Sequence, residues 1–505
     1  MHLRLPVKSL LLLCVLFSPA LARTTQPTTA PADGSKRSEK LAVTDHEMTV
    51  DGQPLKYKAT AGFMPVKDEA GKEKANFFYV AYEKLGEKRE VRPITFVFNG
   101  GPGAAAVWLH LGTAGPKRIV LKDDKGEAPA PPFSVADNES TWLDVTDLVF
   151  IDPIGTGFSR PAAGEKGEAF YGVKEDLSSV AEFIRLYITR YERWLSPKFL
   201  AGESYGTTRA AALSQHLVDG PGIAVNGIML ISVVLDFQTI QPGEGGDLAY
   251  TMYLPTYTAT AWYHKRLAPE LQNDLPAALK EAEAFALGDY ASSLLQGDAL
   301  PAEKRREVVA KLARLTGLLP EYINLTNLRI NPGDFRKLLL QADRRLLGRF
   351  DARIAGYDLS PANAWSDYDP SLSAYLAVYQ SSFNDYVRRS LGFESTLEYE
   401  VLSDRVHPWN WGRNGPGGYL NVTPDLRSAM AKMPYMKVFF ASGYFDLATP
   451  YLAAQHTVNR LNLSPELRQN VSHSFYRGGH MMYHERESRG KLKEDVKRFI
   501  EGAGK

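Results

Sequence analysis

Short runs in which apolar and polar residues alternate fill the chain from about residue 41 to residue 98. The run MTVDGQPLKYKATAG (48–62) contains Asp51-Gly52, a pair typical of a tight hairpin turn, and the runs at 75–84 and 92–98 follow it. Because side chains alternate between the two faces of a strand, this pattern predicts an antiparallel meander that leads into a central strand.

Strand and helix patterns then alternate up to residue 237. The segment 146–159 is an apolar strand that ends in a glycine-rich loop, 174–195 has a helical pattern, 198–217 passes from strand through a tight turn into helix, and 225–237 is a further strand. Strand character returns at 436–446 and 471–480. Strands that alternate with helices predict an α/β fold with a mostly parallel sheet.

The region from 238 to 400 has a different pattern. Its segments 276–296 and 301–319 repeat apolar residues every three to four positions, which is typical of amphipathic helices. We therefore expect a core made of residues 41–237 and 401–505, with a helical cap (238–400) inserted between its strands. An aromatic stretch at 250–265 either fills the interior of this cap or lines the cap side of a cleft; its large side chains are Tyr250, Tyr253, Tyr257, Trp262 and Tyr263.

The N-terminal residues have the pattern of a secretory signal peptide. A basic start, the nine-residue apolar run SLLLLCVLF and a small-x-small ending predict cleavage after Ala22. The apolar run is too short to span a bilayer, and residues 23–40 have the composition of a disordered linker. Cys14 is the only cysteine and would be removed with the signal peptide, so we expect no disulfide in the mature chain. No later segment is apolar over the length of a membrane span, so we expect no span in the mature chain either. These features predict an exported bacterial protein, periplasmic or secreted.

Composition excludes several classes of function. Hydrophobic residues make up 44% of the 505 residues, charged residues make up 23%, and the net charge is +1. No strong field would attract nucleic acid or an anionic membrane, so we expect no nucleic-acid partner. The chain shows no metal-ligand cluster, phosphate-binding loop or cofactor motif, so we expect no cofactor and no metal. The sequence gives no indication of the oligomeric state.

One candidate nucleophile stands in a tight turn. Gly202-Glu203-Ser204-Tyr205-Gly206 fits the pattern G-x-S-x-G, which is weak evidence when it occurs alone. Here an apolar strand precedes it and a helical pattern follows it, as the nucleophile turn of a hydrolase requires. The context favours Ser204 as a nucleophile over an inert loop serine.

A serine nucleophile needs a histidine base and an acid that orients the base. In chain order the acid and the histidine follow the serine in hydrolases with this turn. His480 comes directly after Gly478-Gly479 at the end of a strand and is the best candidate among the seven histidines downstream, which are His216, His264, His407, His456, His473, His480 and His484. Asp446 ends the strand 436–446; it is either the acid or a cap for the next helix.

The loop Asn99-Gly100-Gly101-Pro102-Gly103 consists almost wholly of residues without bulky side chains. Acyl transfer needs backbone N–H groups that stabilise an oxyanion, one from the residue after the nucleophile and one from an earlier glycine-rich loop. Tyr205 supplies the first of these donors, and Gly101 is the expected source of the second.

Five ordered blocks together resemble the serine carboxypeptidases, peptidase family S10. The blocks are FVFNGGPG (96–103), LVFIDPIGTGFS (148–159), FLAGESYG (199–206), FFASGYFDLATP (439–450) and RGGHMMYH (477–484). The resemblance implies an α/β-hydrolase fold with a mostly parallel central sheet and a helical cap insertion. It also implies a triad of Ser204, Asp446 and His480, with an oxyanion hole at Gly101 and Tyr205.

The same resemblance implies a site for the C-terminal carboxylate of a peptide. In the family, the residues that correspond to Asn99, Gly100 and Glu203 hold this carboxylate. The chain departs from the family pattern at two places: Val97 stands where a tryptophan is usual, and Thr113 or Ala114 stands where a second acid is usual. A glutamate beside a substrate carboxylate must be protonated, because two like charges at hydrogen-bond distance cannot both ionise cheaply.

The sequence therefore predicts a serine carboxypeptidase that removes C-terminal residues from peptides through an acyl-enzyme. Two alternative functions remain. An esterase or acyltransferase would keep the triad without the carboxylate site, and a non-catalytic, hydrolase-shaped binding protein would use neither.

Overall fold

A computed structural model describes residues 41–243, 246–412 and 418–503 of the chain. The predicted signal peptide (1–22) and linker (23–40) lie outside the described residues, so both stay predictions. Within the described residues, no helix combines the length and the apolar character that crossing a membrane requires.

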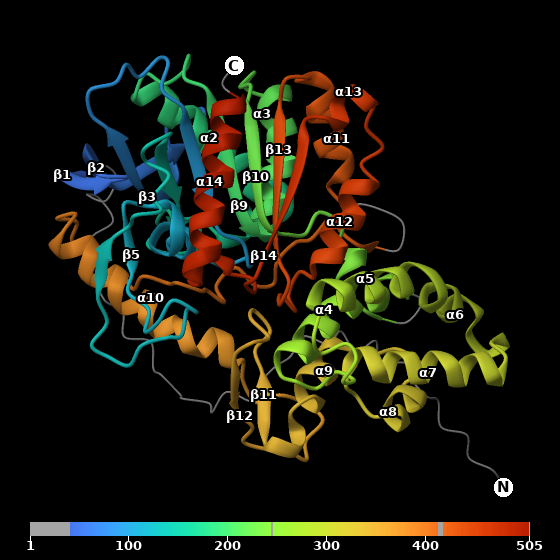
Figure 1. The fold of residues 1–505 in the computed structure, drawn as a ribbon. Coiled ribbons are helices and arrows are strands. Elements are labelled where there is room, and N and C mark those ends of the chain that lie inside the picture. The colour runs from blue at the N-terminus through green and yellow to red at the C-terminus, as the bar shows by residue number, and fades with distance from the viewer. Residues whose placement is uncertain (1–40, 244–245, 413–417, 504–505) are drawn as a thin grey trace, which may run out of the picture. The chain divides into compact units, whose positions relative to one another are not determined.

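A large sheet forms the centre of the fold, with the strand order β1-β2-β3-β7-β4-β9-β10-β13-β14 and with β8 paired to β3 (Figure 1). Strands β1, β2, β3 and β7 pair antiparallel, and β7, β4, β9, β10, β13 and β14 pair parallel. The strands are β1 (Leu41–Val50), β2 (Gln53–Lys67), β3 (Glu73–Lys84), β4 (Ile94–Phe98), β7 (Asp147–Ile151), β8 (Arg160–Pro161), β9 (Lys198–Ser204), β10 (Gly227–Val233), β13 (Lys437–Gly443) and β14 (Val471–Tyr476). The predicted meander and the mostly parallel sheet are confirmed.

Helices cover both faces of the sheet. Most of the residues that separate β10 from β13 in the sequence also form helices. They are α1 (Val107–Leu109), α2 (Val173–Arg190), α3 (Tyr205–Asp219), α4 (Leu248–Tyr263), α5 (Leu275–Phe285), α6 (Ala291–Gln296), α7 (Ala302–Thr316), α8 (Pro320–Leu325), α9 (Pro332–Leu338), α10 (Pro370–Arg389), α11 (Thr423–Lys432), α12 (Tyr451–Asn459), α13 (Pro465–Arg468) and α14 (Arg486–Ala503). Two short hairpins complete the fold: β5 (Lys117–Ile119) with β6 (Val135–Asp137), and β11 (Arg345–Leu347) with β12 (Ala355–Tyr357).

The period-two pattern of each strand divides its side chains between two hydrophobic clusters. In β4, Phe96 and Phe98 belong to the cluster that includes residues of α2, α3 and α11, whereas Val97 belongs to the cluster that includes residues of α10 and α14. In β9, Leu200 faces the first cluster and Phe199 the second. Both faces of the parallel strands are therefore buried, as parallel sheets require.

The helices between β10 and β13 do not all pack in the same way. Apolar side chains of α4, α5, α7 and α9 form a third cluster, which also includes Phe445, Leu447 and Leu452, and these helices lie as a group beside the sheet (Figure 1). Helix α10, which also falls within the predicted cap range 238–400, contributes Tyr379 and Phe383 to a cluster of the sheet instead. We keep the division into core and cap as a proposal.

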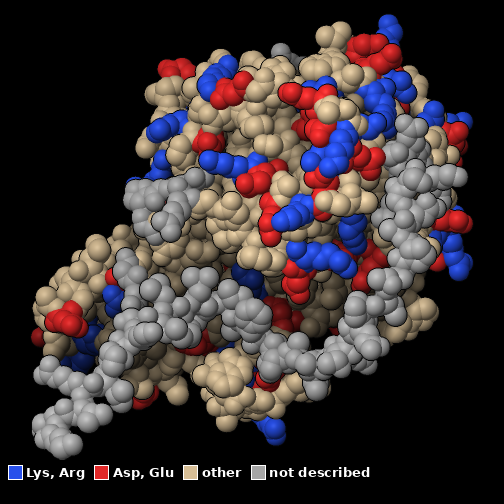
Figure 2. All heavy atoms as spheres, turned by 180° about the vertical axis from the view of Figure 1, so that it is seen from behind, with Lys and Arg blue, Asp and Glu red and all other residues tan. Residues whose placement is uncertain are grey.

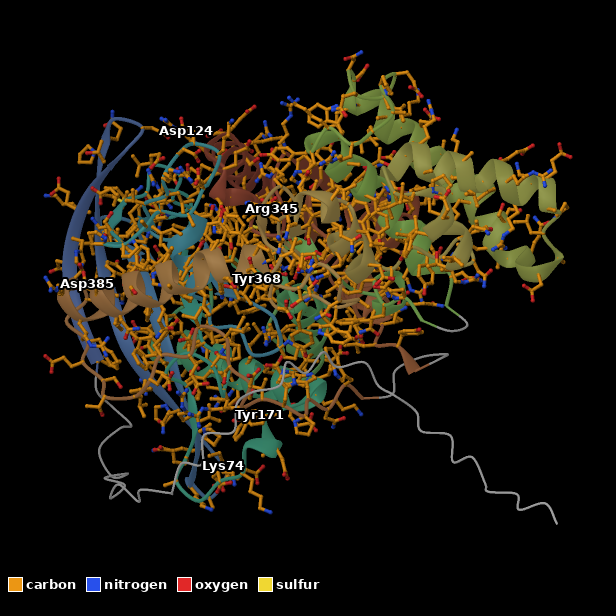
Figure 3. The ribbon with its side chains drawn as sticks, turned by 90° about the horizontal axis from the view of Figure 1, so that it is seen from below. Lys74, Asp124, Tyr171, Arg345, Tyr368 and Asp385 are labelled. Atoms are coloured by element: carbon orange, nitrogen blue, oxygen red, sulfur yellow. The ribbon has the colours of Figure 1, made fainter. Side chains whose placement is uncertain are left out.

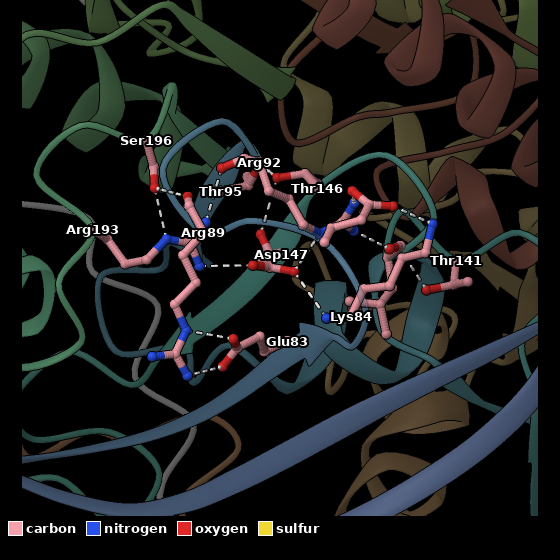
Figure 4. A network of polar contacts seen from close by, with 12 residues as sticks. Glu83, Lys84, Arg89, Arg92, Thr95, Thr141, Thr146, Asp147, Arg193 and Ser196 are labelled. Carbon is pink, nitrogen blue, oxygen red and sulfur yellow. Dashed lines mark hydrogen bonds and ion pairs between the residues drawn. The ribbon is translucent and has the colours of Figure 1, made fainter.

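Charged side chains of both signs are interspersed on the surface seen in Figure 2. One network of buried charges surrounds Asp147 at the start of β7 (Figure 4). Its Oδ1 accepts hydrogen bonds from Arg92 Nε (2.7 Å) and Lys84 N (3.0 Å), and its Oδ2 accepts one from Arg193 Nη1 (2.7 Å). The side chains of Arg92, Asp147 and Arg193 are all less than 5% exposed. This network joins the ends of β3 and β7 to the segments before β4 and β9.

We expect Asp147→Ala to lower the free energy of unfolding by about 3–5 kcal/mol, because it leaves two buried guanidinium groups without their carboxylate. Urea denaturation followed by circular dichroism measures the change. Asp385→Ala is the matched control, because Asp385 (labelled in Figure 3) pairs with Arg389 on the exposed surface of α10. The control should change stability by less than about 0.5 kcal/mol, and an equal loss in both variants would contradict the prediction.

Candidate active site

Ser204 lies at the sharp turn between β9 and α3, as the G-x-S-x-G pattern predicts. Its backbone has φ +60° and ψ −129°, a conformation that non-glycine residues rarely adopt. The neighbouring chain has no room for side chains, because a Cβ on Gly202 would lie 2.1 Å from the carbonyl oxygen of Gly206. Gly202 is therefore needed to close the turn, and Gly206 allows the turn to approach the end of β4, where a Cβ would lie 2.9 Å from the carbonyl oxygen of Phe98.

The loop 99–103 packs directly against this turn. A Cβ on Gly100 would lie 2.4 Å from Tyr205 N and 2.6 Å from Gly206 N, so only a glycine allows the two backbones to approach. Gly101 follows with φ +99°, in the left-handed region that favours glycine. Tyr205 is the first residue of α3, and the first N–H groups of a helix have no partner inside it.

His480 and Asp446 are hydrogen-bonded to each other. His480 Nδ1 and Asp446 Oδ2 are 2.7 Å apart, and both side chains are at most 3% exposed. Asp446 also accepts hydrogen bonds from the N–H groups of Ala448 and Thr449 and from the Thr449 hydroxyl (2.6 Å). Because Asp446 occupies Nδ1, Nε2 is the ring nitrogen that can exchange a proton with a group in the cavity.

The pKa of His480 is raised above its ordinary value. Burial of the ring by itself would lower this pKa, but the charge of Asp446 and its hydrogen bond raise it, with a further contribution from Glu203. The alternative role for Asp446, a cap for the next helix, is not what the structure shows: α12 begins at Tyr451 and Pro450 occupies the capping position.

A cavity of about 420 Å³ brings most of the predicted site residues together. Among its lining residues are Asn99, Gly100, Gly101, Glu203, Ser204, Tyr205 and His480. Asp446 does not itself line this cavity, but it is hydrogen-bonded to His480, which does. Of the alternative histidines, His407 alone among the described residues also lines the cavity, on the loop after α10.

Glu203 is buried at the back of this cavity with one oxygen paired. Its Oε1 accepts a hydrogen bond from Asn99 Nδ2 (2.9 Å), whereas its Oε2 has no partner among the described residues. Burial raises the pKa of Glu203 to about 7, and the charge of Asp446 adds to this, while His480, Tyr483 and Asn99 act in the opposite direction. Glu203 is therefore a proton donor in mildly acidic solution.

Arg209 on α3 holds the two glycine-rich turns together, a role that no sequence motif indicated. Its Nη1 donates to the carbonyl of Asn99 (2.6 Å), and its Nε pairs with Asp176 Oδ2 on α2 (2.7 Å). The guanidinium also lies 5.2 Å and 5.3 Å from the ring centres of Phe98 and Tyr205. Arg209 thus contacts residues on both turns.

The residues at the two departures from the family pattern are buried and do not line the cavity. Val97 is fully buried in β4, in the cluster that includes α10 and α14. Thr113 is also fully buried, and its hydroxyl has no partner among the described residues. At the neighbouring Gly112, a Cβ would lie 2.3 Å from the ring of Tyr483, so aromatic side chains fill the space beside this segment.

Sequence reasoning missed several residues that line the cavity. They are Trp108, Arg349, Phe350, Leu372, Trp411 and Met481. They come from five separate segments, and only Met481 lies within one of the five sequence blocks. The aromatic stretch 250–265 does not line this cavity; Tyr253 and Tyr257 are buried in the cluster of the inserted helices instead. Throughout the described residues, no group of three or more His, Cys, Asp or Glu could hold a metal ion.

A protein-family profile identifies the family to which the chain belongs. The serine carboxypeptidase profile matches residues 50–494, which include all five sequence blocks. The chain belongs to the serine carboxypeptidase family. With the strand–turn–helix at Ser204 and the mostly parallel sheet, the fold of this family member is the predicted α/β-hydrolase fold.

Individual relatives match shorter parts of the chain. Serine carboxypeptidase-like 16 of Arabidopsis thaliana is 25% identical over 195 residues, which are 36% of this chain and 42% of that protein. Pheromone-processing carboxypeptidase KEX1 of Eremothecium gossypii is 33% identical over 152 residues, 29% of this chain and 22% of that protein. The chain thus spans less than half the length of these curated relatives.

Solved structures resemble the chain more distantly. VinJ has a TM-score of 0.38 at 14% identity, and the match covers 87% of this chain and 98% of VinJ. A lipase in its open form has a TM-score of 0.33 at 14% identity, and that match covers 92% of this chain and 99% of the lipase.

We expect Gly100→Ala to lower the free energy of unfolding by about 3 kcal/mol, at the upper end of the usual cost of overpacking, because the added methyl group meets rigid backbone. Urea denaturation measures this loss. Gly490→Ala is the control: Gly490 lies inside α14 with nothing within 4 Å of the added carbon, so alanine should stabilise the helix by about 0.5–1 kcal/mol. Equal effects of the two substitutions would contradict the packing argument.

Proposed function

We propose that this chain is a serine carboxypeptidase, which removes C-terminal residues from peptides through a Ser204–His480–Asp446 triad and an acyl-enzyme. The observation that carries the proposal is the cavity in which Ser204 and the Asp446-bonded His480 lie beside Glu203, a buried acid with a pKa of about 7. Membership of the serine carboxypeptidase family supports it. We also propose, from residues 1–22, that the protein is exported to the periplasm or secreted.

The first step forms the acyl-enzyme. Ser204 Oγ attacks the carbonyl carbon of the last peptide bond while its proton passes to His480 Nε2. The N–H groups of Gly101 and Tyr205 stabilise the negative charge that develops on the carbonyl oxygen. The C–N bond then breaks, and the leaving amine takes the proton from His480.

The second step releases the shortened peptide. Water attacks the acyl-enzyme ester while His480 Nε2 takes a proton from it, and His480 passes this proton to Ser204 Oγ when the ester bond breaks. Throughout both steps Asp446 stays ionised, accepts the hydrogen bond from Nδ1 and stabilises the imidazolium.

Recognition of the free C-terminus involves Asn99, Gly100 and Glu203. Glu203 lines the cavity, and its carboxyl group can donate a hydrogen bond to a substrate carboxylate when it is protonated. Below its pKa of about 7 the Glu203 carboxyl is neutral and donates; above it, the carboxylate repels the substrate. Binding of a free carboxylate should therefore weaken as pH rises through this value.

The decisive measurement compares an N-blocked dipeptide with the same dipeptide amidated at its C-terminus, at about pH 5 and about pH 7.5. Protonation of His480 slows both reactions, so its effect cancels in the ratio of their kcat/KM values. We expect this ratio of free acid to amide to be higher at the lower pH, and Ser204→Ala to abolish both activities. Ser403→Ala is the control, because Ser403 also lines the cavity.

The other outcomes separate the alternatives. Equal or faster cleavage of the amide or of an ester, dependent on Ser204, would replace the proposal with an esterase or acyltransferase. No turnover of any of these substrates would favour the binding protein. The observation that favours the esterase is that Thr113 or Ala114, both fully buried, stands where the family usually has a second acid.

We expect Glu203→Gln to remove the pH dependence of KM for the free-acid dipeptide. A glutamine amide donates a hydrogen bond at every pH, so KM should stay within about threefold between pH 5 and pH 8, where the wild-type KM rises above pH 7. Steady-state kinetics across this range provide the test. A Glu203→Gln variant whose KM still rises as steeply as the wild-type value would show that another group controls binding.

A further inference from the structure

One segment of the inserted region contacts both loops that carry the proposed acid and base. Residues 349–353, here called the clamp segment, connect β11 to β12; the hairpin can be located in Figure 3 from Arg345, the first residue of β11. The segment lies within the predicted cap range, more than 90 residues before Asp446 in the sequence. No motif in it pointed to the active site.

Backbone hydrogen bonds connect the clamp segment to the residues before and after Asp446. The N–H of Leu447 donates to the carbonyl of Arg349 (3.0 Å), and the N–H of Ala352 donates to the carbonyl of Phe445 (3.0 Å). Since these are the residues directly before and after Asp446, the backbone of the acid loop is fixed by the clamp segment.

The clamp segment is also bonded to the histidine itself. The backbone N–H of His480 donates to the carbonyl of Phe350 (2.5 Å), and the rings of Phe350 and His480 are 5.1 Å apart. A Cβ on Gly479 would lie 2.3 Å from that same carbonyl oxygen and 2.6 Å from Asp351 Cα. This close approach explains why glycine precedes the histidine.

Arg353 holds the clamp segment in this position. Its Nη2 and Nε bond to Asp351, with Nη2 2.6 Å from Oδ2, and its Nη1 donates to the carbonyl of Arg477 (2.7 Å) on the histidine loop. The same guanidinium lies 5.4 Å from the ring centre of Phe445. The side chains of Arg353 and Asp351 are 11% and 9% exposed, so solvent competes little with the bonds between these two side chains.

We propose that Arg353 is a positioning residue for the reaction: bonded to Asp351, it holds the clamp segment against the loops of Asp446 and His480 and so fixes the imidazole for proton transfer with Ser204. This inference rests on the proposed triad. Arg353 itself does not line the cavity at Ser204, so it acts through the backbone and not by touching the substrate.

The proposal has a signature in the pH dependence. The charged groups that act on the pKa of His480 are Asp446 and Glu203, which raise it, and Arg349, which lowers it. If the clamp segment loosens, the Asp446 contact weakens and the pKa of His480 falls. Removal of the positive charge of Arg353 would by itself raise this pKa, so the direction of the shift separates positioning from direct electrostatics.

The test measures how fast a fluorophosphonate labels Ser204, since this reaction needs the nucleophile and base but no carboxylate site. We expect Arg353→Met to slow labelling by about 10- to 100-fold, the cost of a small misplacement of reacting groups. The acidic limb of the rate against pH should move to lower pH. Circular dichroism confirms that the variant is folded, and peptide cleavage should lose kcat with KM little changed.

Arg329→Met is the matched control. Arg329 makes a comparable bidentate pair with Asp247 in the inserted region, at 2.8 Å and 2.9 Å, without a bond to either catalytic loop. Its labelling rate and pH limb should stay at the wild-type values. Wild-type labelling by Arg353→Met, a limb displaced to higher pH, or equal losses in both variants would each overturn the proposal.

A second variant covers the case in which Arg353→Met does not fold. Arg353→Lys keeps the charge but loses the planar fork that bonds Asp351 and the Arg477 carbonyl together. Its labelling rate should lie between the wild-type rate and the rate slowed by about 10- to 100-fold that we expect when the Arg353 bonds are lost. A wild-type rate would contradict the proposal. A wild-type protein that is not labelled at Ser204 would overturn both the triad and the clamp, whereas one that is labelled but cleaves no peptide would overturn only the proposed substrate.

Discussion

Two glycine-rich turns meet backbone to backbone, and the candidate active site is built on this contact. Gly100 approaches the start of α3 so closely that a Cβ would lie 2.4 Å from Tyr205 N, while Gly202 closes the turn around Ser204. Only backbone fits between the two turns, so backbone N–H groups are what the cavity presents near the serine. Arg209 secures the arrangement by contacting residues on both turns.

Burial acts on the ionisable groups of this cavity in opposite directions. It raises the pKa of Glu203 to about 7, because an isolated carboxylate is poorly solvated there. It also disfavours the charged form of His480, but the neighbouring Asp446 more than offsets this and raises the pKa of the imidazole. The same apolar surroundings thus leave one carboxyl able to donate a proton and one histidine able to accept one.

The region inserted in sequence between β10 and β13 also contacts the loops of the candidate active site. Apolar side chains of its helices α4, α5, α7 and α9 form a third cluster, yet the segment between β11 and β12 returns to the core and bonds to the loops of Asp446 and His480. A displacement of the inserted region would therefore also displace the imidazole of His480. Asp351 and Arg353, which stiffen this segment, connect the two parts of the fold.

Features that depend on neighbouring residues could be predicted from the amino-acid sequence. The alternation of apolar residues specified the strands, the glycines around Ser204 specified the turn, and the chain order pointed to Asp446 and His480. Contacts between distant segments could not be predicted in this way: those of Arg209 with the two turns, and those of the clamp segment with the His480 loop. Such contacts have no periodicity or motif, because their geometry arises from the packing of separate elements against one sheet.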